Sequence, residues 1–402
     1  MPYPSWVRAI YSARKYLSGQ ITHANNVTKE KETVSFLQQL GMKIESIIKR
    51  GSDTFHYLIH PSVFWTKAAY KAACEELNSL PENERQSTAV VASFPPLGPL
   101  IVGYKLATKY DLPLCLDYRD LWIGLGKTAP AHASPVRLLQ LINVYCRKRI
   151  ERKASIAVVI SEGQREMHTE QSELKTAVIP NGFDFSKKKR NGTRKKKDTS
   201  LIIIRHLGLI YPPNRTPQPL LNALRGIHDA SHKLHVEFYG TQPDLLLPMI
   251  CESGCEAICS IYPQVPHTTS LELQQNADLL LLLDWSDENV KGVTAAKVFE
   301  YLASERPILL VGATEKSELK QLIQSSNAGY VFGTDPELIR KFLQDMIRRP
   351  QKYLHPRPIS TIALQYDRKL LAEKYLQLIY RLIEEKNLER ATQHYTAPFG
   401  AV

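Results

Sequence analysis

Residues 292–311 read Gly-Val-Thr-Ala-Ala-Lys-Val-Phe-Glu-Tyr-Leu-Ala-Ser-Glu-Arg-Pro-Ile-Leu-Leu-Val. This pattern predicts a turn of small residues, then an amphipathic helix, then a buried strand. Gly292 and Thr294 suit the start of that helix, where free backbone N–H groups and the positive end of the helix dipole can hold an anion. Lys297 and Glu300 are three residues apart, so they lie on one face of the predicted helix.

Two interpretations of Lys297 and Glu300 are open on spacing alone. A lysine near a helix N-terminus suits a phosphate, and a carboxylate one turn later suits a pair of sugar hydroxyls, so the two side chains could bind one ligand. The alternative is a surface ion pair on an ordinary helix. Other segments of the sequence are needed to choose between these two interpretations.

The segment 292–311 resembles the donor-nucleotide site of GT-B glycosyltransferases of the family-4-like type, in which a Thr-Gly-Lys-Leu-Phe-Glu-Tyr-Leu-Ala-Ala-Gly-Arg-Pro-Ile string recurs. Three further segments resemble that family in the same order: Leu-Asp-Tyr-Arg-Asp-Leu-Trp at 116–122, Val-Ile-Pro-Asn-Gly-Phe-Asp at 178–184, and His-Leu-Gly-Leu-Ile-Tyr at 206–211. The resemblance runs from about residue 93 to about residue 383. It implies an α/β fold of two Rossmann-like parallel-sheet domains that face each other across a cleft.

The chain has 402 residues, enough for two domains that each bury a core. Apolar β-rich segments alternate with helical ones from residue 87 to 179 and again from 201 to 311, which predicts two parallel sheets. We therefore expect an acceptor-side domain at 1–185, a basic linker at 186–199, a nucleotide-sugar-binding domain at 200–361, and a helix at 362–388. The resemblance implies that this helix crosses back onto the first domain.

Residues 1–85 depart from the family pattern, in which a strand and a Gly-rich loop open the chain. Instead Trp6, Ile10, Ala13 and Leu17 share one helical face beside basic residues, a pattern typical of a core-facing helix or an interfacial one. We expect this region to be helical. We also expect an incomplete first sheet, either because the chain starts late or because those strands were lost.

The net charge of +12 is concentrated in one place, because residues 187–197 carry eight positive charges and leave +4 for the rest of the chain. Such a run is a solvated linker or, alternatively, an anchor for anionic lipid or nucleic acid. Binding to nucleic acid is not expected, since no recognised motif and no interleaved aromatic residues accompany the run. A peripheral contact with an anionic membrane stays open beside the linker.

Six cysteines without a signal peptide indicate a reducing compartment, and no apolar run approaches the ~18 residues that span a bilayer. We expect a cytoplasmic protein, with peripheral attachment to the inner face of the membrane as the alternative. Cys251, Cys255 and Cys259 fall at i, i+4 and i+8, which predicts one helical face. Their spacing matches no common zinc or iron–sulfur pattern, so small buried helix residues are favoured over metal ligands.

A transferase that uses a nucleotide sugar must stabilise the leaving diphosphate, and positive side chains can do so without a metal. The resemblance implies that Arg215 and Lys297 hold the diphosphate and that Gly208 lets the backbone approach it. It implies that Glu300 binds the ribose and that His267 lines the base pocket. The expected donor-binding residues are Gly208, Arg215, His267, Thr294, Lys297 and Glu300.

His206 has two interpretations, a contact with phosphate or sugar, or an ordinary satisfied histidine at the end of a strand. No cofactor is expected beyond the nucleotide-sugar donor substrate. No metal site is expected either, because the sequence has no dense acidic cluster, with Asp284 and Asp287 as a weak exception.

The acceptor side of the expected cleft offers Asp117, Arg119 and Asp120, at the end of a predicted strand. We expect Asp120 to orient the acceptor hydroxyl and Arg119 to bind a phosphate or Asp120. An ion pair that fixes a loop is the alternative. The sequence has Pro99-Leu100 where part of the family carries a histidine, and Gly292 where many members carry the first glutamate of a Glu-x7-Glu motif.

The sequence therefore predicts transfer of a sugar from a nucleotide diphosphate to a glycan or glycolipid acceptor, metal-independent and, as the resemblance implies, with retention of configuration. A first rival is a degenerate or truncated GT-B paralogue that binds nucleotide without efficient turnover. A second is a nucleotide-sugar epimerase, which would require more acidic residues in the cleft than the sequence provides.

Overall fold

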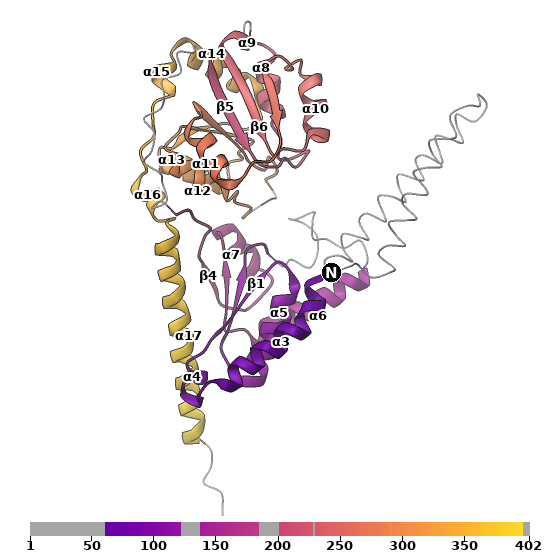
Figure 1. Ribbon diagram of the computed structural model, residues 1–402, viewed down its shortest axis with the longest axis vertical. Coiled ribbons are helices and arrows are strands. Elements are labelled where there is room, and N and C mark those ends of the chain that lie inside the picture. The colour runs from indigo at the N-terminus through magenta and orange to yellow at the C-terminus, as the bar shows by residue number, and fades with distance from the viewer. Residues whose placement is uncertain are drawn as a thin grey trace, which may run out of the picture.

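The computed structural model describes residues 61–121, 137–184, 201–227, 230–288, 290 and 292–396. Within these ranges the chain forms two parallel sheets, one of four strands and one of six, each flanked by helices. Figure 1 shows the six-stranded sheet in the upper body, the four-stranded sheet in the lower body, and the final helix along the side of the lower body. The predicted class, α/β with two Rossmann-like parallel sheets, is confirmed.

The first sheet has the strand order β1-β2-β3-β4. Its strands are β1 (Val90–Phe94), β2 (Leu114–Tyr118), β3 (Ile156–Val159) and β4 (Thr176–Val178). The connecting helices are α5 (Leu97–Tyr110), α6 (Arg137–Lys153) and α7 (Glu162–Thr169). All five residues of β2 are buried, as expected for a parallel strand that helices cover on both faces.

The described part of the first 85 residues is helical, as predicted, with α3 (Pro61–Ser79) followed by α4 (Glu82–Gln86). Helix α3 packs against α5 through a small apolar cluster that includes Cys74, Leu77 and Leu106. The predicted helical face of Trp6, Ile10, Ala13 and Leu17 lies outside the described residues, and so does the basic linker at 186–199.

The second sheet has the order β10-β9-β8-β5-β6-β7. Its strands are β5 (Ile202–Leu207), β6 (Leu234–Tyr239), β7 (Cys259–Tyr262), β8 (Leu279–Leu283), β9 (Ile308–Val311) and β10 (Gly329–Val331). This is the doubly wound order, which reverses direction between β5 and β8. Open α/β sheets bind ligands at this switch point, beyond the carboxyl ends of the strands.

Helices cover both faces of the second sheet. They are α8 (Gln218–Leu224), α9 (Ala230–Lys233), α10 (Pro243–Glu252), α11 (His267–Gln275), α12 (Lys297–Ala303), α13 (Glu318–Ser325), α14 (Pro336–Arg348), α15 (Pro350–Tyr353) and α16 (Thr361–Leu364). One core forms between the sheet and α8, α10 and α14, around Ile204 and Phe238. The other forms beneath α12 and α13, around Leu280 and Phe299.

The prediction that three cysteines share a helical face is wrong. Cys251 lies in α10, Cys255 follows the end of that helix, and Cys259 belongs to β7. The helix stops because Gly254 adopts a φ of +63°, a left-handed conformation that ends many helices. Cys255 is buried, and burial raises the pKa of Cys259 to about 12.

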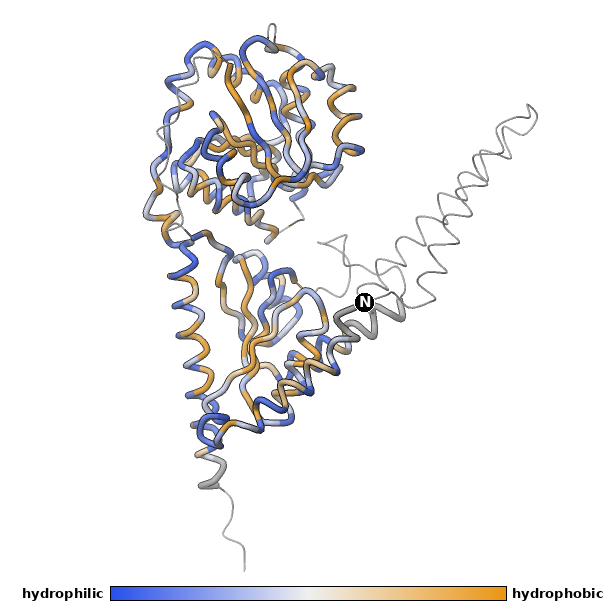
Figure 2. The backbone as a smooth tube through the Cα atoms, in the orientation of Figure 1, coloured by the Kyte–Doolittle hydropathy of each residue, from blue (hydrophilic) through white to orange (hydrophobic). Residues whose placement is uncertain are grey.

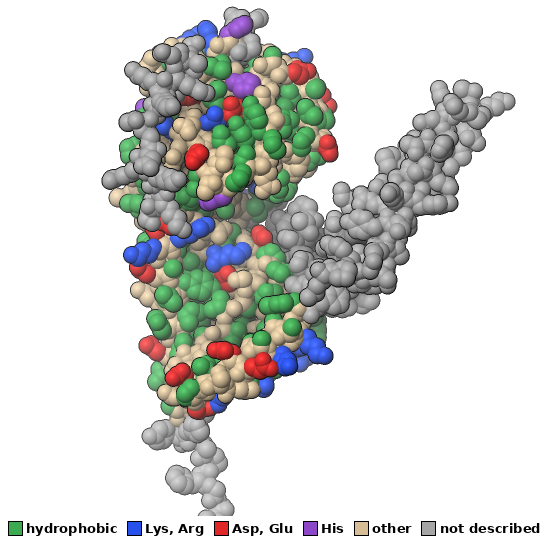
Figure 3. All heavy atoms as spheres, viewed as in Figure 1, with side chains coloured by type: hydrophobic (Ala, Val, Ile, Leu, Met, Phe, Trp, Pro, Cys, Tyr) green, Lys and Arg blue, Asp and Glu red, His purple; other side chains and the backbone are tan. Residues whose placement is uncertain are grey.

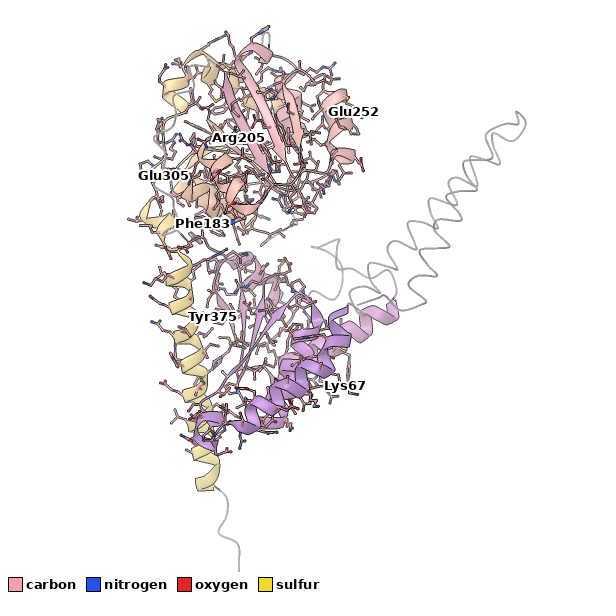
Figure 4. The ribbon with its side chains drawn as sticks, in the orientation of Figure 1. Lys67, Phe183, Arg205, Glu252, Glu305 and Tyr375 are labelled. Atoms are coloured by element: carbon pink, nitrogen blue, oxygen red, sulfur yellow. The ribbon has the colours of Figure 1, made fainter. Side chains whose placement is uncertain are left out.

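The predicted terminal helix is divided in two, because a turn separates α16 from α17 (Arg368–Thr396). At this turn the backbone of Phe183 pairs with Tyr366 and Arg368, so the two chain crossings between the bodies run side by side (Figure 4). Figure 2 shows apolar and polar residues alternating along α17. Leu371 and Leu382 of α17 are buried in one apolar cluster with Cys115 of β2 and Val158 of β3, so the final helix lies against the first sheet.

None of the helices in the described ranges is long and apolar enough to cross a membrane.

Candidate functional site

The carboxyl ends of β5 and β8 form the switch point of the second sheet. The ladder between the two strands ends at Arg205, and side chains bridge them beyond it. His206 Nδ1 lies 3.0 Å from Leu281 O, and Arg215 Nε donates to Leu283 O at 3.0 Å. The strand ends therefore carry an imidazole and a guanidinium where a parallel sheet of this type binds its ligand.

Gly208 follows β5 directly and has a φ of +148°, which side chains rarely adopt. Its backbone is held firmly, since its N–H donates to Tyr239 O at 3.0 Å and its carbonyl accepts from Thr241 Oγ1 at 2.7 Å. The nearest atom to the position of a Cβ on Gly208 is His206 Nε2, at 4.0 Å. The missing side chain leaves open space at the strand end.

Arg215 closes the loop that follows Gly208. Its backbone pairs with that of Tyr211 in both directions, at 2.8 and 3.0 Å, and its guanidinium lies 5.7 Å from the centre of the Tyr211 ring. Burial lowers the pKa of Arg215, an effect that Tyr211 and Asp284 oppose. The side chain is half-buried and bonded to Leu283 O, which fixes it at the end of β8, while the guanidinium keeps its charge.

Lys297 and Glu300 lie on one face of α12, as predicted. Lys297 Nζ is 2.7 Å from Glu300 Oε2, and Gln274 Nε2 donates to the same oxygen at 2.8 Å. His267 Nε2 is 3.4 Å from Glu300 Oε1. Burial raises the pKa of Glu300, but the hydrogen bonds from Lys297 and Gln274 outweigh it, so the pKa is lowered and the carboxylate is ionised at neutral pH.

Sequence reasoning missed Gln274 and Ser270, which support this pair from α11. Gln274 is fully buried, and its amide also donates to Ser270 Oγ at 3.2 Å. The two residues lie three and seven positions after His267, so all three share one face of α11. That spacing was the available signal.

The predicted helix start at Gly292 and Thr294 is wrong, because α12 begins at Lys297. Gly292 has a φ of +69°, and a Cβ there would fall 2.5 Å from the backbone nitrogen of Gln164. Thr294 Oγ1 donates to Glu318 Oε2 at 3.2 Å. Gly292 is thus pressed against α7 of the first body, and Thr294 is bonded to α13 of the second, in a loop that precedes α12.

The carboxyl ends of the two sheets meet at this loop. The N–H of Gly163, at the start of α7, donates to Glu318 Oε1 at 2.6 Å, and Ser161 Oγ donates to Gly292 O at 3.3 Å. Figure 3 shows Lys and Arg side chains gathered on the first body just below this junction. The strand ends of the two sheets thus face the same region.

On the first sheet, Asp117 is almost fully buried near the end of β2. Its Oδ2 accepts from Ser93 Oγ at 2.8 Å and from Arg119 Nε at 2.9 Å, while Arg119 Nη1 donates to Asn181 Oδ1 at 3.3 Å. The expectation that Arg119 pairs with Asp120 is therefore wrong, since its partners are Asp117 and Asn181. Asp120 is exposed at the bend after the strand.

No group of three or more His, Cys, Asp and Glu side chains that could hold a metal ion occurs within the described ranges. A mainly apolar cavity of about 770 Å³ lies between α10 and β7, with Tyr262 and Cys251 in its wall. His206, Arg215, Lys297 and Glu300 do not line it. The cavity borders the switch point through Thr241, which is bonded to Gly208 O, and the proposed donor residues lie outside its lining.

No protein-family model matches the chain, and no curated protein sequence matches it either. Solved structures do match. Sucrose-phosphate synthase from Thermosynechococcus elongatus superposes with a TM-score of 0.53 at 13% identity, over 73% of each chain. The pneumococcal O-GlcNAc transferase GtfA, solved with UDP and GlcNAc, gives 0.50 at 13% identity, over 74% of this chain and 57% of that one. At this identity the likeness shows the fold, and the chain has the GT-B fold.

Proposed function

We propose that the chain is a glycosyltransferase that binds a nucleotide-diphosphate sugar at the carboxyl ends of the second sheet. The observation that carries this proposal is the switch point, where open space at Gly208 and the cation of Arg215 lie beside α12. Tyr301 of α12 accepts from the backbone N–H of Leu207 at 3.1 Å, which holds the helix against the end of β5. The Lys297 and Glu300 cluster is on the same helix.

In this proposal Arg215 and Lys297 bind the diphosphate. A phosphate oxygen replaces Glu300 as the partner of Lys297, so the lysine exchanges one anion for another. Gly208 allows the backbone to approach the diphosphate, because no side chain fills the space beside it. As the bond to the sugar breaks, negative charge grows on the leaving phosphate, and each fixed cation then lowers the barrier by a few kcal/mol.

Glu300 is proposed to accept hydrogen bonds from the two ribose hydroxyls. Gln274 holds one carboxylate oxygen, and the low pKa of Glu300 keeps the group an acceptor. His267 is proposed to line the base pocket, because its side chain is 65% exposed and its ring borders Glu300. A donor contact by Thr294 stays a prediction, and the hydroxyl of Thr294 is bonded to Glu318.

For the acceptor side we propose Asp120, whose exposed carboxylate can orient a glycan or glycolipid hydroxyl. Asp117 and Asn181 fix the side chain of Arg119, which then presents a positive charge at the carboxyl end of the first sheet. Retention of configuration and a reaction without a metal are part of the proposal and come from the resemblance of the motifs.

A second candidate, a GT-B protein that binds nucleotide without efficient turnover, has one observation in its favour. Leu100 in α5 is completely buried, at the position where part of the family carries a histidine. The first body therefore offers an apolar residue of the core instead of a group that could contact the donor sugar.

Titration calorimetry with UDP, GDP and ADP tests the proposal, followed by NMR detection of hydrolysis of the matching nucleotide sugars. UDP is the first probe, since the structure of the pneumococcal neighbour contains it. We expect one nucleoside diphosphate to bind at micromolar concentration, about −8 kcal/mol. Binding with release of sugar supports the transferase, and binding without release supports the second candidate. Failure of all three nucleotides to bind would contradict both.

A further inference from the structure

His206 is a buried histidine with one unexplained nitrogen. The residue is 2% exposed, and its Nδ1 lies 3.0 Å from Leu281 O. A carbonyl oxygen only accepts hydrogen bonds, so Nδ1 carries the proton and Nε2 presents a lone pair. Within the described part of the chain Nε2 has no hydrogen-bond partner. A buried polar atom without a partner is uncommon in native proteins and requires an explanation.

The unpartnered nitrogen points toward the space at Gly208. It is 4.0 Å from the position that a Cβ on Gly208 would occupy, and the φ of +148° at this residue keeps that space free of a side chain. Gly208 lies beyond the end of β5, at the switch point where the proposed diphosphate binds. An atom of the diphosphate placed there would face Nε2.

The charges around His206 favour the neutral imidazole while this space is empty. Burial lowers the pKa of His206 to about 4, the positive charge of Arg215 lowers it further, and the backbone of Leu281, Leu209 and Gly208 opposes the shift. Phe238 faces the ring from β6 with its centre 6.0 Å away and contributes no charge.

Three further titratable groups act on Arg215: Asp284 directly after β8, Tyr211 of its own loop and Tyr301 of α12. A bound diphosphate would bring two negative charges next to the imidazole. Arg215 lowers the pKa of His206, whereas these negative charges raise it and so favour the imidazolium.

We propose that the diphosphate of the donor binds against Nε2 of His206 through the space at Gly208, and that the imidazole takes up one proton as it binds. The proton comes from solvent and adds to the lone pair of Nε2. The new N–H then donates to a phosphate oxygen, so the pair becomes charge-assisted. This inference rests on the proposed donor site and adds to it a residue that couples donor binding to pH.

The test is calorimetry of UDP binding to the full chain at pH 7.5 in two buffers of different ionisation enthalpy, with GDP and ADP alongside. At this pH the terminal phosphate of UDP, with a pKa of about 6, contributes few protons. The wild-type protein is expected to take up close to one proton per nucleotide. His206→Asn keeps a donor for Leu281 O but lacks Nε2, so proton uptake should vanish and affinity at pH 7.5 should fall about tenfold.

His235→Asn is the matched control. His235 lies in β6, where its Nε2 is 3.0 Å from Ser260 Oγ, and it does not border Gly208. This variant should keep both the affinity and the proton uptake of the wild type. Should His206→Asn fail to fold by circular dichroism, the wild-type comparison between the two buffers still decides the matter.

Nucleotide binding without proton uptake in the wild-type protein would overturn the inference and leave the donor site standing. That is the result expected if a sugar hydroxyl donates to Nε2 instead. If none of the three nucleotides binds, the donor site itself is overturned, and this inference with it.

Discussion

Replacing Lys297 by alanine removes one of the two cations proposed to hold the diphosphate. In the free protein Lys297 Nζ lies 2.7 Å from Glu300 Oε2, and the two side chains are 29% and 17% exposed. Glu300 keeps its hydrogen bond from Gln274 in the variant, so the carboxylate is not left without a partner. The substitution should therefore change ligand binding more than folding.

The expected loss follows from the chemistry of the contact. A hydrogen bond to a charged group contributes roughly 1.5–3 kcal/mol, and the partial exposure of Lys297 places its contact with the diphosphate near the middle of that range. We expect Lys297→Ala to weaken UDP binding by about 2 kcal/mol, which is about thirtyfold in Kd. Titration calorimetry measures this directly.

Lys341→Ala is the matched control, because Lys341 is an exposed lysine of α14 in the same body. It should leave the Kd for UDP unchanged. The melting temperature of both variants should stay close to that of the wild type. An unchanged Kd in a folded Lys297→Ala protein would refute the role of Lys297 in diphosphate binding.

Three further predictions concern the ribose contact, pH and the final helix. Glu300→Gln should weaken UDP by about 1–2 kcal/mol in calorimetry while sparing inorganic pyrophosphate, because only UDP has a ribose; equal losses for both ligands would contradict the assignment. Burial lowers the pKa of His206 to about 4 from 6.5, so the unfolded chain binds one more proton between these values and stability falls as pH drops from 6.5 to 4. In urea denaturation the free energy of unfolding of the wild type should fall by up to about 3 kcal/mol over this window. His206→Asn should be less stable than the wild type at pH 7, and this difference in free energy of unfolding should be smaller at pH 4.5. A difference of the same size at both pH values would refute the lowered pKa of His206. Leu371→Ala should lower the free energy of unfolding by about 2–4 kcal/mol, since this α17 side chain is only 6% exposed against the first sheet, and no change in urea denaturation would mean that the helix does not stabilise that body.

The fold could be predicted from local patterns because its strands are short apolar runs. The segment Leu279–Leu283 consists of five leucines, and all of them are buried in β8. Such runs alternate with helical segments, and this alternation alone predicts parallel sheets. The pairing of Lys297 with Glu300 was also predictable, because both residues lie within one helical turn.

The contacts between the two bodies could not be predicted, because they join residues far apart in the chain. Gly163 and Glu318 are 155 positions apart, and no sequence motif links the two residues. A second contact between the bodies explains why the helix expected at Gly292 begins later, since Gly292 is pressed against Gln164 near the start of α7. Non-local packing here overrode a local helix signal.

The pairing of Arg119 with Asp117 could have been predicted from the alternation of side chains along a strand. Side chains of an extended segment alternate in direction, so residues 117 and 119 point to the same side and residue 120 to the other. The ladder with β1 continues for one residue past β2, where Arg119 N–H donates to Phe94 O at 2.9 Å, and the chain bends at residues 119 and 120. Arg119 therefore reaches Asp117, and Asp120 is left exposed.

A crystal structure of the full chain with bound UDP tests the central claim most directly. We predict that the diphosphate lies at the ends of β5 and β8, against Gly208 and Arg215, with Lys297 turned toward it and the ribose hydroxyls on Glu300. Density for the nucleotide in the cavity between α10 and β7, beside Tyr262, with nothing bound at Gly208, would contradict the account.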